Sequence, residues 1–362
     1  MAKSIFITNQ FKTGGVETVF LNLARNTEED IYLFPIHNNQ DNYLISDLPD
    51  NVHLIKNKYY LRRNIFGLLK AIYVAFVYRR LLNATEMRVI NFSDTLTTLL
   101  IAFILNPRNC ISWIHCNPLA LLNARTHRLY WWLLRECKNI IFISESQRKL
   151  FFEMSESSSI DINKSKVCLN FIDFDHINKK KKEAFDYEGK FFLTVARLDL
   201  RSKDYKTLIK GYSLLPSDIK KEYKLLIAGD GKDKRKIEGF IEEYNQQGNI
   251  ILLGNVDNPY KYMVHSTLYI HSSISEGFSM SIIEALACGC TVVASNCKVG
   301  PSEILENGKY GYLYNPGDYK TLAKKIMDGL ENQIDSSVAI KRAESITKLG
   351  KLQIKEFFRN NE

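Results

Sequence analysis

Short apolar segments alternate with longer amphipathic segments along most of the chain. The short segments are rich in β-branched and aromatic residues, and in several of them apolar residues dominate instead of alternating with polar ones. Such strands are typical of parallel sheets covered by helices on both faces, so the pattern predicts βαβ units. The predicted strands are Lys3–Thr8, Asp30–Ile36, Asn51–Lys56, Met87–Phe92, Asn109–His115, Asn139–Ser144 and Lys166–Ile172, then Phe191–Leu198, Tyr223–Asp230, Asn249–Val256, Thr267–Ser273 and Cys290–Ser295.

A polar, lysine-rich stretch from His176 to Lys190 interrupts this alternation, and we interpret it as a linker. The chain of 362 residues, 45% of them hydrophobic, is long enough for two cores. We therefore predict an α/β protein of two Rossmann-like domains facing across a cleft, where ligands bind at the carboxyl ends of the strands. The predicted domains are 1–180 and 181–340, followed by a basic helix at 341–362 that could pack back on the first domain.

Composition narrows the class of protein. The longest apolar runs, Ile65–Tyr78 and Thr95–Leu105, fall short of the ~20 residues of a membrane span and are predicted to be buried helices. Seven cysteines without a CxxC pair or a zinc-type cluster indicate reduced thiols. The first strand follows Met1 without a cleavable signal pattern, so a cytoplasmic location is expected. The net charge of +9 favours anionic partners without choosing among them.

Candidate chemistry is concentrated in the run from Ser275 to Gly289. Glu276 precedes a predicted helix over Met280–Cys288, with Ser279 as its N-cap, and Glu284 lies inside that helix. The unpaired N–H groups and the partial charge of about +0.5 at a helix start bind anions, and carboxylates accept hydrogen bonds from sugar hydroxyls. The spacing suits a sugar, a diphosphate and a ribose laid end to end, although a capping glutamate and a solvent-facing glutamate would explain it equally well.

The run SEGFSMSIIEALACG resembles the EX7E motif of the family 4 retaining glycosyltransferases, which use nucleotide sugars and have the two-domain GT-B fold. The resemblance covers nearly the whole chain and is strongest from Phe191 to Lys325. It implies that the first domain binds the acceptor and the second the donor. It also implies that Glu276 contacts the transferred sugar and Glu284 the ribose. The adjoining donor-binding residues would be Gly277, Phe278 and Ser279.

Arg197 lies near the end of the predicted strand at 191–198, and Arg201 and Lys203 follow on a basic loop. Cations placed there would stabilise a departing diphosphate, although an ordinary solvated loop has the same composition. The resemblance places Arg197 and Lys203 on the donor phosphates. The family has glycine before the arginine and after the lysine, whereas Ala196 and Asp204 stand here, so the path of this loop is left open.

In the first half of the chain, Gly14 and Gly15 open a predicted helix and His115 ends a predicted strand. Paired glycines let a ligand approach the backbone closely, but a plain tight turn is as good an explanation, and GxGxxG is absent. A lone histidine is more often structural than catalytic. The resemblance nevertheless places the glycines beside donor phosphate and acceptor, and it implies that His115 hydrogen-bonds the donor sugar.

Further positions complete the predicted donor site. Gly229 follows a strand and is expected to turn toward the cleft, and Val256 and Tyr260 are candidates for contact with the base. His265 and His271 are interpreted as core or surface histidines. The stretch Gly300–Glu303 resembles one found in many bacterial polysaccharide glycosyltransferases, with its role left open.

The segment Asn170–Asp173 resembles the family's motif at the domain junction. The overlapping Asp173–Asp175 would instead match the DxD metal motif of the other large glycosyltransferase fold, but the two-domain pattern and the EX7E run argue against it. No metal and no cofactor are therefore expected, since the nucleotide sugar is a substrate.

The predicted function is the retaining transfer of a sugar from a nucleotide sugar to a glycan or lipid-linked acceptor in polysaccharide, lipopolysaccharide or capsule synthesis; UDP is favoured by its frequency in the family. Aromatic and basic residues interleave at Tyr59–Lys70 and Arg128–Lys138, which suits peripheral contact with the anionic inner face of the cytoplasmic membrane or two ordinary helices. The alternatives are a nucleotide-sugar epimerase of the same fold and a non-enzymatic basic module that binds nucleic acid or membrane. The site motifs favour the glycosyltransferase over both alternatives. No nucleic-acid partner is expected.

Overall fold

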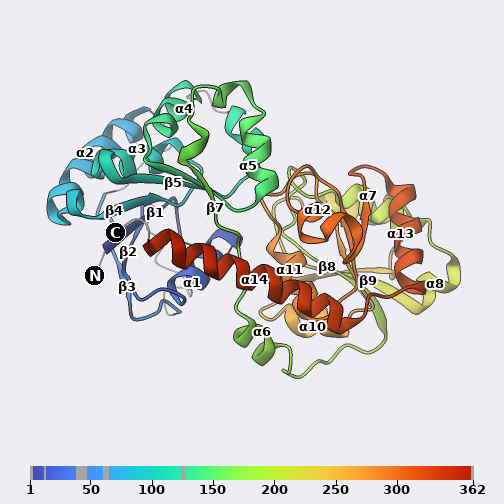
Figure 1. Cartoon of the computed structure of the whole chain (residues 1–362). Helices are drawn as coiled ribbons and strands as arrows, with labels where there is room; N and C mark the ends of the chain where they lie inside the picture. The colour runs from blue at the N-terminus through green and yellow to red at the C-terminus, as the bar shows by residue number, and fades with distance from the viewer. Residues whose placement is uncertain (1–2, 12–13, 38–46, 60–64, 124–126, 360–362) are drawn as a thin grey trace. The chain divides into compact units, whose positions relative to one another are not determined.

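The computed structural model describes residues 3–11, 14–37, 47–59, 65–123 and 127–359. The chain divides into two compact units (Figure 1), one formed by Met1–Asn170 with Leu349–Glu362 and the other by Phe171–Lys348. Each unit is a parallel sheet with helices on both faces, so the predicted α/β class is confirmed.

The first unit is built on a seven-stranded sheet of order β3-β2-β1-β4-β5-β6-β7 with every pair parallel. The chain order reverses at β1, so right-handed crossovers place α1 on one face and α2 to α5 on the other (Figure 1). The strands are β1 (Lys3–Thr8), β2 (Asp30–Pro35), β3 (Val52–Leu54), β4 (Arg88–Asn91), β5 (Cys110–Ile114), β6 (Asn139–Phe142) and β7 (Ser165–Val167).

Two helices of this unit begin where the sequence provides a side-chain cap. Thr95 Oγ1 accepts from the N–H of Thr98 at the start of α3, and Ser144 Oγ accepts from Gln147 at the start of α5. The helices are α1 (Gly15–Ala24), α2 (Ile65–Leu81), α3 (Leu96–Leu105), α4 (His127–Glu136) and α5 (Glu145–Phe152).

The two long apolar runs differ in burial. The run Thr95–Leu105 forms α3, which buries Leu99, Ile101 and Leu105 as predicted. The run Ile65–Tyr78 forms most of α2, but the prediction of a buried helix is wrong for one of its faces, where Phe66 is 73% exposed. The buried face of α2 holds Ala71, Val74, Ala75 and Tyr78. No described helix is long and apolar enough to cross a bilayer.

The end of the chain belongs to the first unit. The last part of α14 (Ser336–Arg359) buries Phe357 and Phe358 there, and the Arg88 guanidinium lies 5.7 and 5.2 Å from the centres of their rings. Arg88 also pairs with Glu29 at 3.1 Å and donates to the Phe358 carbonyl at 3.3 Å. A buried guanidinium is stable only with such partners, so these contacts fix the terminus on the sheet.

The second unit contains a six-stranded parallel sheet of order β10-β9-β8-β11-β12-β13. All twelve predicted strands are present in the two sheets, but the short thirteenth strand was not predicted. The strands are β8 (Lys190–Val195), β9 (Tyr223–Ala228), β10 (Ile250–Gly254), β11 (Leu268–His271), β12 (Val292–Ser295) and β13 (Tyr312–Tyr314). The helices are α6 (Phe174–Lys180), α7 (Tyr205–Ser213), α8 (Ser217–Glu222), α9 (Lys234–Glu243), α10 (Tyr260–His265), α11 (Met280–Ala287), α12 (Pro301–Ile304) and α13 (Tyr319–Glu331).

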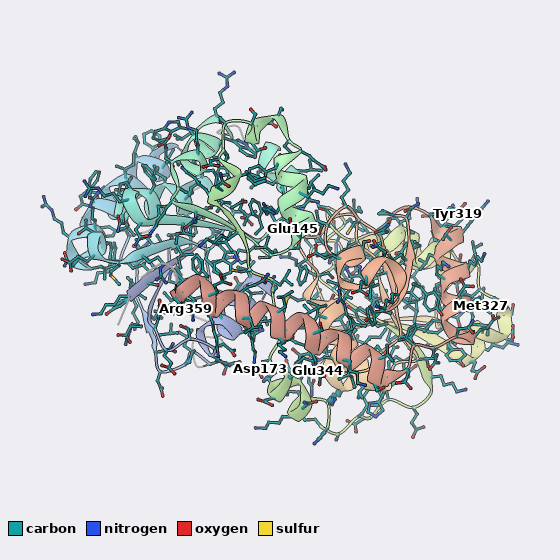
Figure 2. The ribbon with its side chains drawn as sticks, viewed as in Figure 1. Glu145, Asp173, Tyr319, Met327, Glu344 and Arg359 are labelled. Atoms are coloured by element: carbon teal, nitrogen blue, oxygen red, sulfur yellow. The ribbon has the colours of Figure 1, made fainter. Side chains whose placement is uncertain are left out.

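The division between the units lies after Asn170, whereas the sequence placed it at residue 180. The difference arises because α6 packs against α10 and α11 and so belongs to the second unit. Asp173, labelled in Figure 2, starts α6 by accepting a hydrogen bond from the His176 N–H at 3.0 Å. The other crossing lies after Lys348, inside α14, and not at residue 340.

The seven cysteines are free thiols, as the sequence predicted. Six are buried and Cys116 is half-buried. Cys110 Sγ and Cys137 Sγ lie 3.8 Å apart without a covalent bond, and their mutual hydrogen bond raises the pKa of Cys110.

Candidate active site

The predicted donor residues of the second unit gather where two neighbouring strands end. β8 and β11 are adjacent and parallel, so the loops after Val195 and His271 leave the same edge of the sheet. These loops touch, because Lys203 and Ser273 form an isolated antiparallel bridge. The sheet therefore brings together Lys203 of the basic loop and Glu276, the first glutamate of the motif, which are 73 positions apart in the chain.

Glu276 is the centre of this cluster. Its Oε1 accepts hydrogen bonds from the Lys203 ammonium, from Ser273 Oγ at 2.6 Å and from His271 Nε2 at 3.1 Å. Lys203 also donates to Ser273 Oγ at 3.0 Å. The side chains of Glu276 and Lys203 are only 14% and 16% exposed, so the ion pair is largely shielded from water.

Charge keeps Glu276 ionised despite its burial. Burial alone would raise the pKa of its carboxyl group, but the Lys203 ammonium and the His271 hydrogen bond hold that pKa well below its usual range. An ionised carboxylate only accepts hydrogen bonds. Glu276 is therefore suited to receive sugar hydroxyls, and unsuited to serve as a general acid near neutral pH.

His271 holds the Glu276 carboxylate in place from the end of strand β11. Its ring is 98% buried, since the side chain is only 2% exposed, and Nε2 lies 3.0 Å from Ser279 Oγ as well as close to Glu276. Burial lowers the pKa of His271, against the opposing effect of Glu276. The imidazole is therefore neutral, and Nε2 must carry its proton to donate to the carboxylate.

The start of α11 differs in one respect from the prediction. Ser279 occupies the N-cap position, but it has a left-handed backbone with φ of 82° and its side chain makes no cap hydrogen bond. The hydroxyl turns to His271 instead. The first N–H groups of α11 thus lack a side-chain cap, which leaves them available to an anionic ligand.

Glu284 lies more than one turn inside α11 and is half-buried, so it does not simply face solvent. Burial raises the pKa of its carboxyl group to about 7, although the hydrogen bond from Tyr260 acts in the opposite direction. Tyr260 is the first residue of α10, and its Oη lies 3.4 Å from Glu284 Oε1. The structure thus pairs two predicted donor residues, whereas Val256 lies in the loop after β10 without a hydrogen bond to either.

The basic loop holds its two arginines differently. Arg201 forms a two-point pair with Asp199 at 3.0 and 2.7 Å. The Arg197 side chain is exposed and makes no hydrogen bond or ion pair with any residue that the structure describes. Arg197 is therefore the cation of this loop that a diphosphate could engage without breaking an existing pair.

The two departures from the family pattern have a structural explanation. Asp204 has φ of −102°, which needs no glycine, and its side chain caps α7 by accepting from the Thr207 N–H at 3.1 Å. Ala196 lies against Gly229, where an added Cβ would come within 2.1 Å of the Ala196 carbonyl oxygen. The close approach between the loops after β8 and β9 therefore depends on Gly229, and no glycine is needed for it at position 196.

Gly300 has a similar role beside the helix start. Its φ is 98°, and an added Cβ would lie 2.3 Å from the Phe278 carbonyl oxygen. Phe278 itself is buried, at 2% exposure, and anchors the loop that carries Gly277. The sequence left the role of the Gly300–Glu303 stretch open. In the structure, Gly300 of this stretch packs against Phe278 of the candidate donor loop.

In the first unit, His115 follows β5 with both ring nitrogens buried and without a hydrogen-bond partner among the described residues. Burial lowers the pKa of His115 to about 3. Trp113 stacks parallel to the ring at 6.2 Å, and Phe92 meets it edge-on at 4.2 Å. A neutral imidazole with unsatisfied nitrogens fits the predicted contact with a ligand, which stays a prediction.

Asp94 shapes the loop of His115 and was missed by the sequence analysis. Its carboxylate accepts from the backbone N–H of His115 at 3.1 Å and of Cys116 at 2.8 Å. Burial raises the pKa of Asp94 to about 6, against these hydrogen bonds. Gly14 and Gly15 stand at the start of α1, while Thr13 beside them lies outside the described residues.

His271 and Ser273 were also missed as site residues. His271 ends a strand at the carboxyl edge of its sheet, which is the signal that pointed to His115, so the sequence offered a reason to choose it. His265, by contrast, is an exposed residue stacked on Phe185 at 4.4 Å, in agreement with its interpretation as a surface histidine. Within the described ranges, no group of three or more His, Cys, Asp or Glu residues is placed to hold a metal ion.

Comparison with known proteins gives this geometry a context. Residues 175–346 match the family described as glycosyl transferases group 1. The chain is 33% identical over 180 residues to the Campylobacter jejuni N-acetylgalactosamine-N,N'-diacetylbacillosaminyl-diphospho-undecaprenol 4-alpha-N-acetylgalactosaminyltransferase, covering 50% of this chain and 48% of that protein. It is 32% identical over 147 residues to the Escherichia coli lipopolysaccharide 1,6-galactosyltransferase, covering 38% and 40%. The matched part thus spans about half of these relatives or less.

The fold comparison covers the whole chain. Anabaena HepE, crystallised with UDP and glucose, superposes with a TM-score of 0.79 at 19% identity over 99% of both chains. A sucrose-phosphate synthase from Thermosynechococcus elongatus gives 0.79 at 16% identity over 99% of both chains. These similarities establish the GT-B fold. The glycosyltransferase resemblance of the sequence is confirmed by the match of residues 175–346, a little less than half of the chain, to the group 1 glycosyl transferases.

Proposed function

We propose that the protein transfers a sugar, with retention of configuration, from a UDP-sugar to a glycan or lipid-linked acceptor in bacterial surface polysaccharide synthesis. The observation that carries the proposal is the buried, ionised Glu276, held by Lys203, Ser273 and His271 beside an uncapped helix start. The relatives that act on lipid-linked and lipopolysaccharide acceptors, and HepE with its UDP, support the choice of substrates.

In this proposal the donor lies along the start of α11. The carboxylate of Glu276 accepts hydrogen bonds from the sugar, and the half-buried Glu284 faces the ribose beside Tyr260. The diphosphate takes the free N–H groups of the helix start and the side chains of Arg197 and Lys203. The role that the resemblance gives His115 is that of a neutral hydrogen-bonding group.

The reaction exchanges one bond for another at the anomeric carbon. The bond from that carbon to the phosphate oxygen breaks, and a bond to the acceptor hydroxyl oxygen forms on the same face. The acceptor proton passes to the departing phosphate oxygen, so no glycosidase-type pair of carboxylates is required. Arg197 and Lys203 stabilise the negative charge that develops on the nucleoside diphosphate.

The proposal includes transfer without a metal cofactor, since two side-chain cations and a helix start supply the positive charge that the leaving group needs. Activity with UDP-sugars should therefore persist after EDTA treatment. Loss of activity that a divalent ion restores would contradict this part alone.

The test is thermal-shift screening of the full chain against UDP, GDP and ADP sugars, followed by product analysis with the sugars that stabilise it. A UDP-sugar should raise the melting temperature of the wild type and of Arg201→Ala, but not of Glu276→Ala or Arg197→Ala. Stabilisation of neither wild type nor control by any nucleotide sugar would overturn the proposal. Conversion of the donor sugar without an acceptor would identify an epimerase instead.

A further inference from the structure

The outer face of α2 is unusual for a helix on the surface of a soluble domain. Phe66, Leu69, Tyr73 and Phe76 recur at helical spacing on that face and are 73%, 60%, 58% and 55% exposed. Surface helices normally turn polar residues outward, and single exposed apolar residues need no explanation. A continuous outward row of four does need one.

The exposed aromatic residues are concentrated on two helices. All four described large aromatics that are exposed, namely Phe66, Tyr73, Phe76 and Trp132, lie on α2 or α4. α3 packs against both helices, since Arg79 donates to the Ile104 carbonyl at 2.8 Å and Trp132 meets Phe103 at 5.9 Å. The two helices thus flank α3 on one side of the first unit (Figure 1).

The charges on this side are mainly positive. α2 has no acidic residue, and Lys70 and Arg80 stand among its exposed positions. α4 exposes Arg128, Leu129, Trp132, Arg135 and Glu136, of which Arg135 and Glu136 pair at 3.0 Å. The acidic residues here include Glu86, exposed just after α2, and the half-buried Glu156, which lines the recess beside α4.

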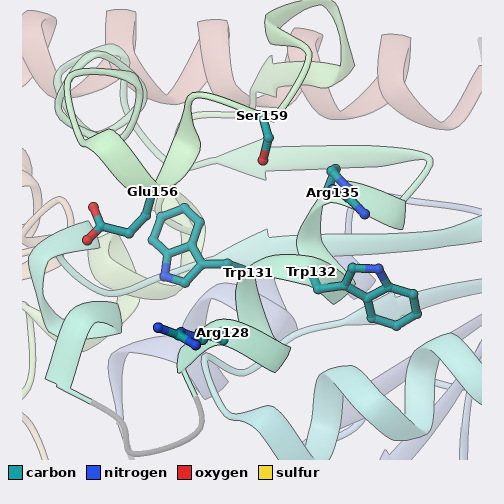
Figure 3. Close-up of a pocket in the computed structure, with 6 residues that line it drawn as sticks. All are labelled: Arg128, Trp131, Trp132, Arg135, Glu156 and Ser159. Carbon is teal, nitrogen blue, oxygen red and sulfur yellow. The ribbon is translucent and has the colours of Figure 1, made fainter.

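A shallow recess beside α4 adds a place for an anionic group. It has a volume of about 270 Å³ and is lined by Arg128, Trp131, Trp132, Arg135, Glu156 and Ser159. Figure 3 shows the two tryptophans turned in opposite directions, with Arg128 and Arg135 on the same helix. Trp131 is buried and Trp132 is 45% exposed, so an indole and two guanidinium groups face outward together.

From this combination we infer that the α2–α4 face, defined by Phe66, Leu69, Lys70, Tyr73, Phe76, Arg80, Arg128, Leu129, Trp132 and Arg135, rests on an anionic lipid bilayer. Aromatic and leucine side chains enter the headgroup region, while lysine and arginine take the lipid phosphates. A bilayer fits better than a second copy of the chain, because two copies of a basic face would repel each other. The inference does not depend on the proposed reaction.

Flotation with vesicles tests the inference on the full chain. The wild type should bind vesicles of phosphatidylcholine with phosphatidylglycerol at low salt and bind pure phosphatidylcholine much less. The double variant F66S/F76S should bind the anionic vesicles at least about tenfold more weakly, because it removes two inserting rings. K70E/R80E should weaken binding mainly at low salt.

Matched controls separate this face from general surface effects. Leu214, 52% exposed in the second unit, supplies the apolar control L214S, and the exposed Lys221 supplies the charge control K221E. Both should bind like the wild type, and all variants should keep its melting temperature. The inference is overturned if the wild type ignores anionic vesicles, or if F66S/F76S binds as well as L214S. A dimer in sedimentation that F66S/F76S dissolves, without vesicle binding, would assign the face to a second copy. None of these outcomes would change the stabilisation of the protein by UDP-sugars, which tests the proposed reaction separately.

Discussion

His271 Nε2 lies 3.1 Å from Glu276 Oε1, beneath a carboxylate that also receives the Lys203 ammonium. The histidine ends strand β11, so the rigid sheet fixes the position of a side chain in the following loop. His271 does not need to touch a substrate for this effect, and it is a positioning residue.

Removing the N–H group by which His271 hydrogen-bonds Glu276 should therefore affect the reaction more than the fold. We expect His271→Leu to lower kcat by about ten- to a hundredfold, since a hydrogen bond to a charged group is worth ~1.5–3 kcal/mol. Because that hydrogen bond also lowers the pKa of Glu276, the acid limb of the pH profile should move to higher pH. His271→Gln, which can offer an amide N–H at a similar reach, should recover most of the activity. Equal kcat and an unmoved pH profile in His271→Leu would show that the contact is only structural.

Arg197 and Lys203 should separate activity from stability. Arg197→Ala should leave the melting temperature unchanged, because its side chain is exposed and unpaired among the described residues, and it should lower kcat by about 10²- to 10³-fold. Lys203→Ala should lower kcat similarly and also destabilise the protein by roughly 3 kcal/mol, because it strands the carboxylate of Glu276.

Arg201→Ala is the control in the same loop, since Arg201 already pairs with Asp199. It should change kcat little. Denaturant unfolding and steady-state kinetics measure both effects. A large loss of activity in Arg201→Ala, or a stable Lys203→Ala protein, would contradict this assignment of roles.

Glu284 should make stability depend on pH. The pKa of its carboxyl group in the folded state, about 7, lies above the ordinary value of 4.5, so the folded state holds the proton more tightly than the unfolded state. The stability from this group is complete below about pH 4.5, falls as pH rises, and is lost above about pH 7. Glu284→Gln removes the ionisation. The melting temperature of this variant relative to wild type should therefore rise between pH 5 and pH 8, which corresponds to a gain of up to about 3 kcal/mol in the free energy of unfolding. A constant difference would show that Glu284 titrates normally.

Gly229 offers a test of the close approach between the loops after β8 and β9. Gly229→Ala should cost several kcal/mol, because its φ is 140° and the new Cβ would lie 2.1 Å from a carbonyl oxygen. Gly248→Ala shares a positive φ, 75°, but has open space, so it should cost only about 1 kcal/mol. Gly239→Ala, inside α9 and without steric conflict, should be neutral or stabilising by up to about 1 kcal/mol. Chemical denaturation of the three variants should reproduce this order.

Most of the fold could be predicted because its strands are buried on both faces and therefore appear as compact apolar segments. β13 escaped because its residues, Tyr312–Tyr314, stand between glycine, asparagine and proline and form no such apolar segment. The break between the units was placed too late because the local sequence of α6 shows its polarity but not its packing against α10 and α11.

The candidate site could be predicted in part because Glu276 and Glu284 stand in one recognisable motif, while Lys203 was chosen from a separate basic loop. The partners of Glu276 were harder to find, because their role depends on which strands are neighbours. Ser273 and His271 become relevant only once β8 lies beside β11. The left-handed Ser279 could not be predicted either, since a serine before a helix ordinarily caps it.

The path of α14 has a consequence for how the protein is made. The second unit is one continuous stretch, Phe171–Lys348, whereas the first unit needs the final residues of the chain to cover Arg88 and Trp113. During synthesis the second unit can therefore complete its fold before the part of α14 that the first unit needs has been made. A ribosome that stops before Phe357 would release a chain whose second unit is complete but whose first unit lacks the segment that covers Arg88.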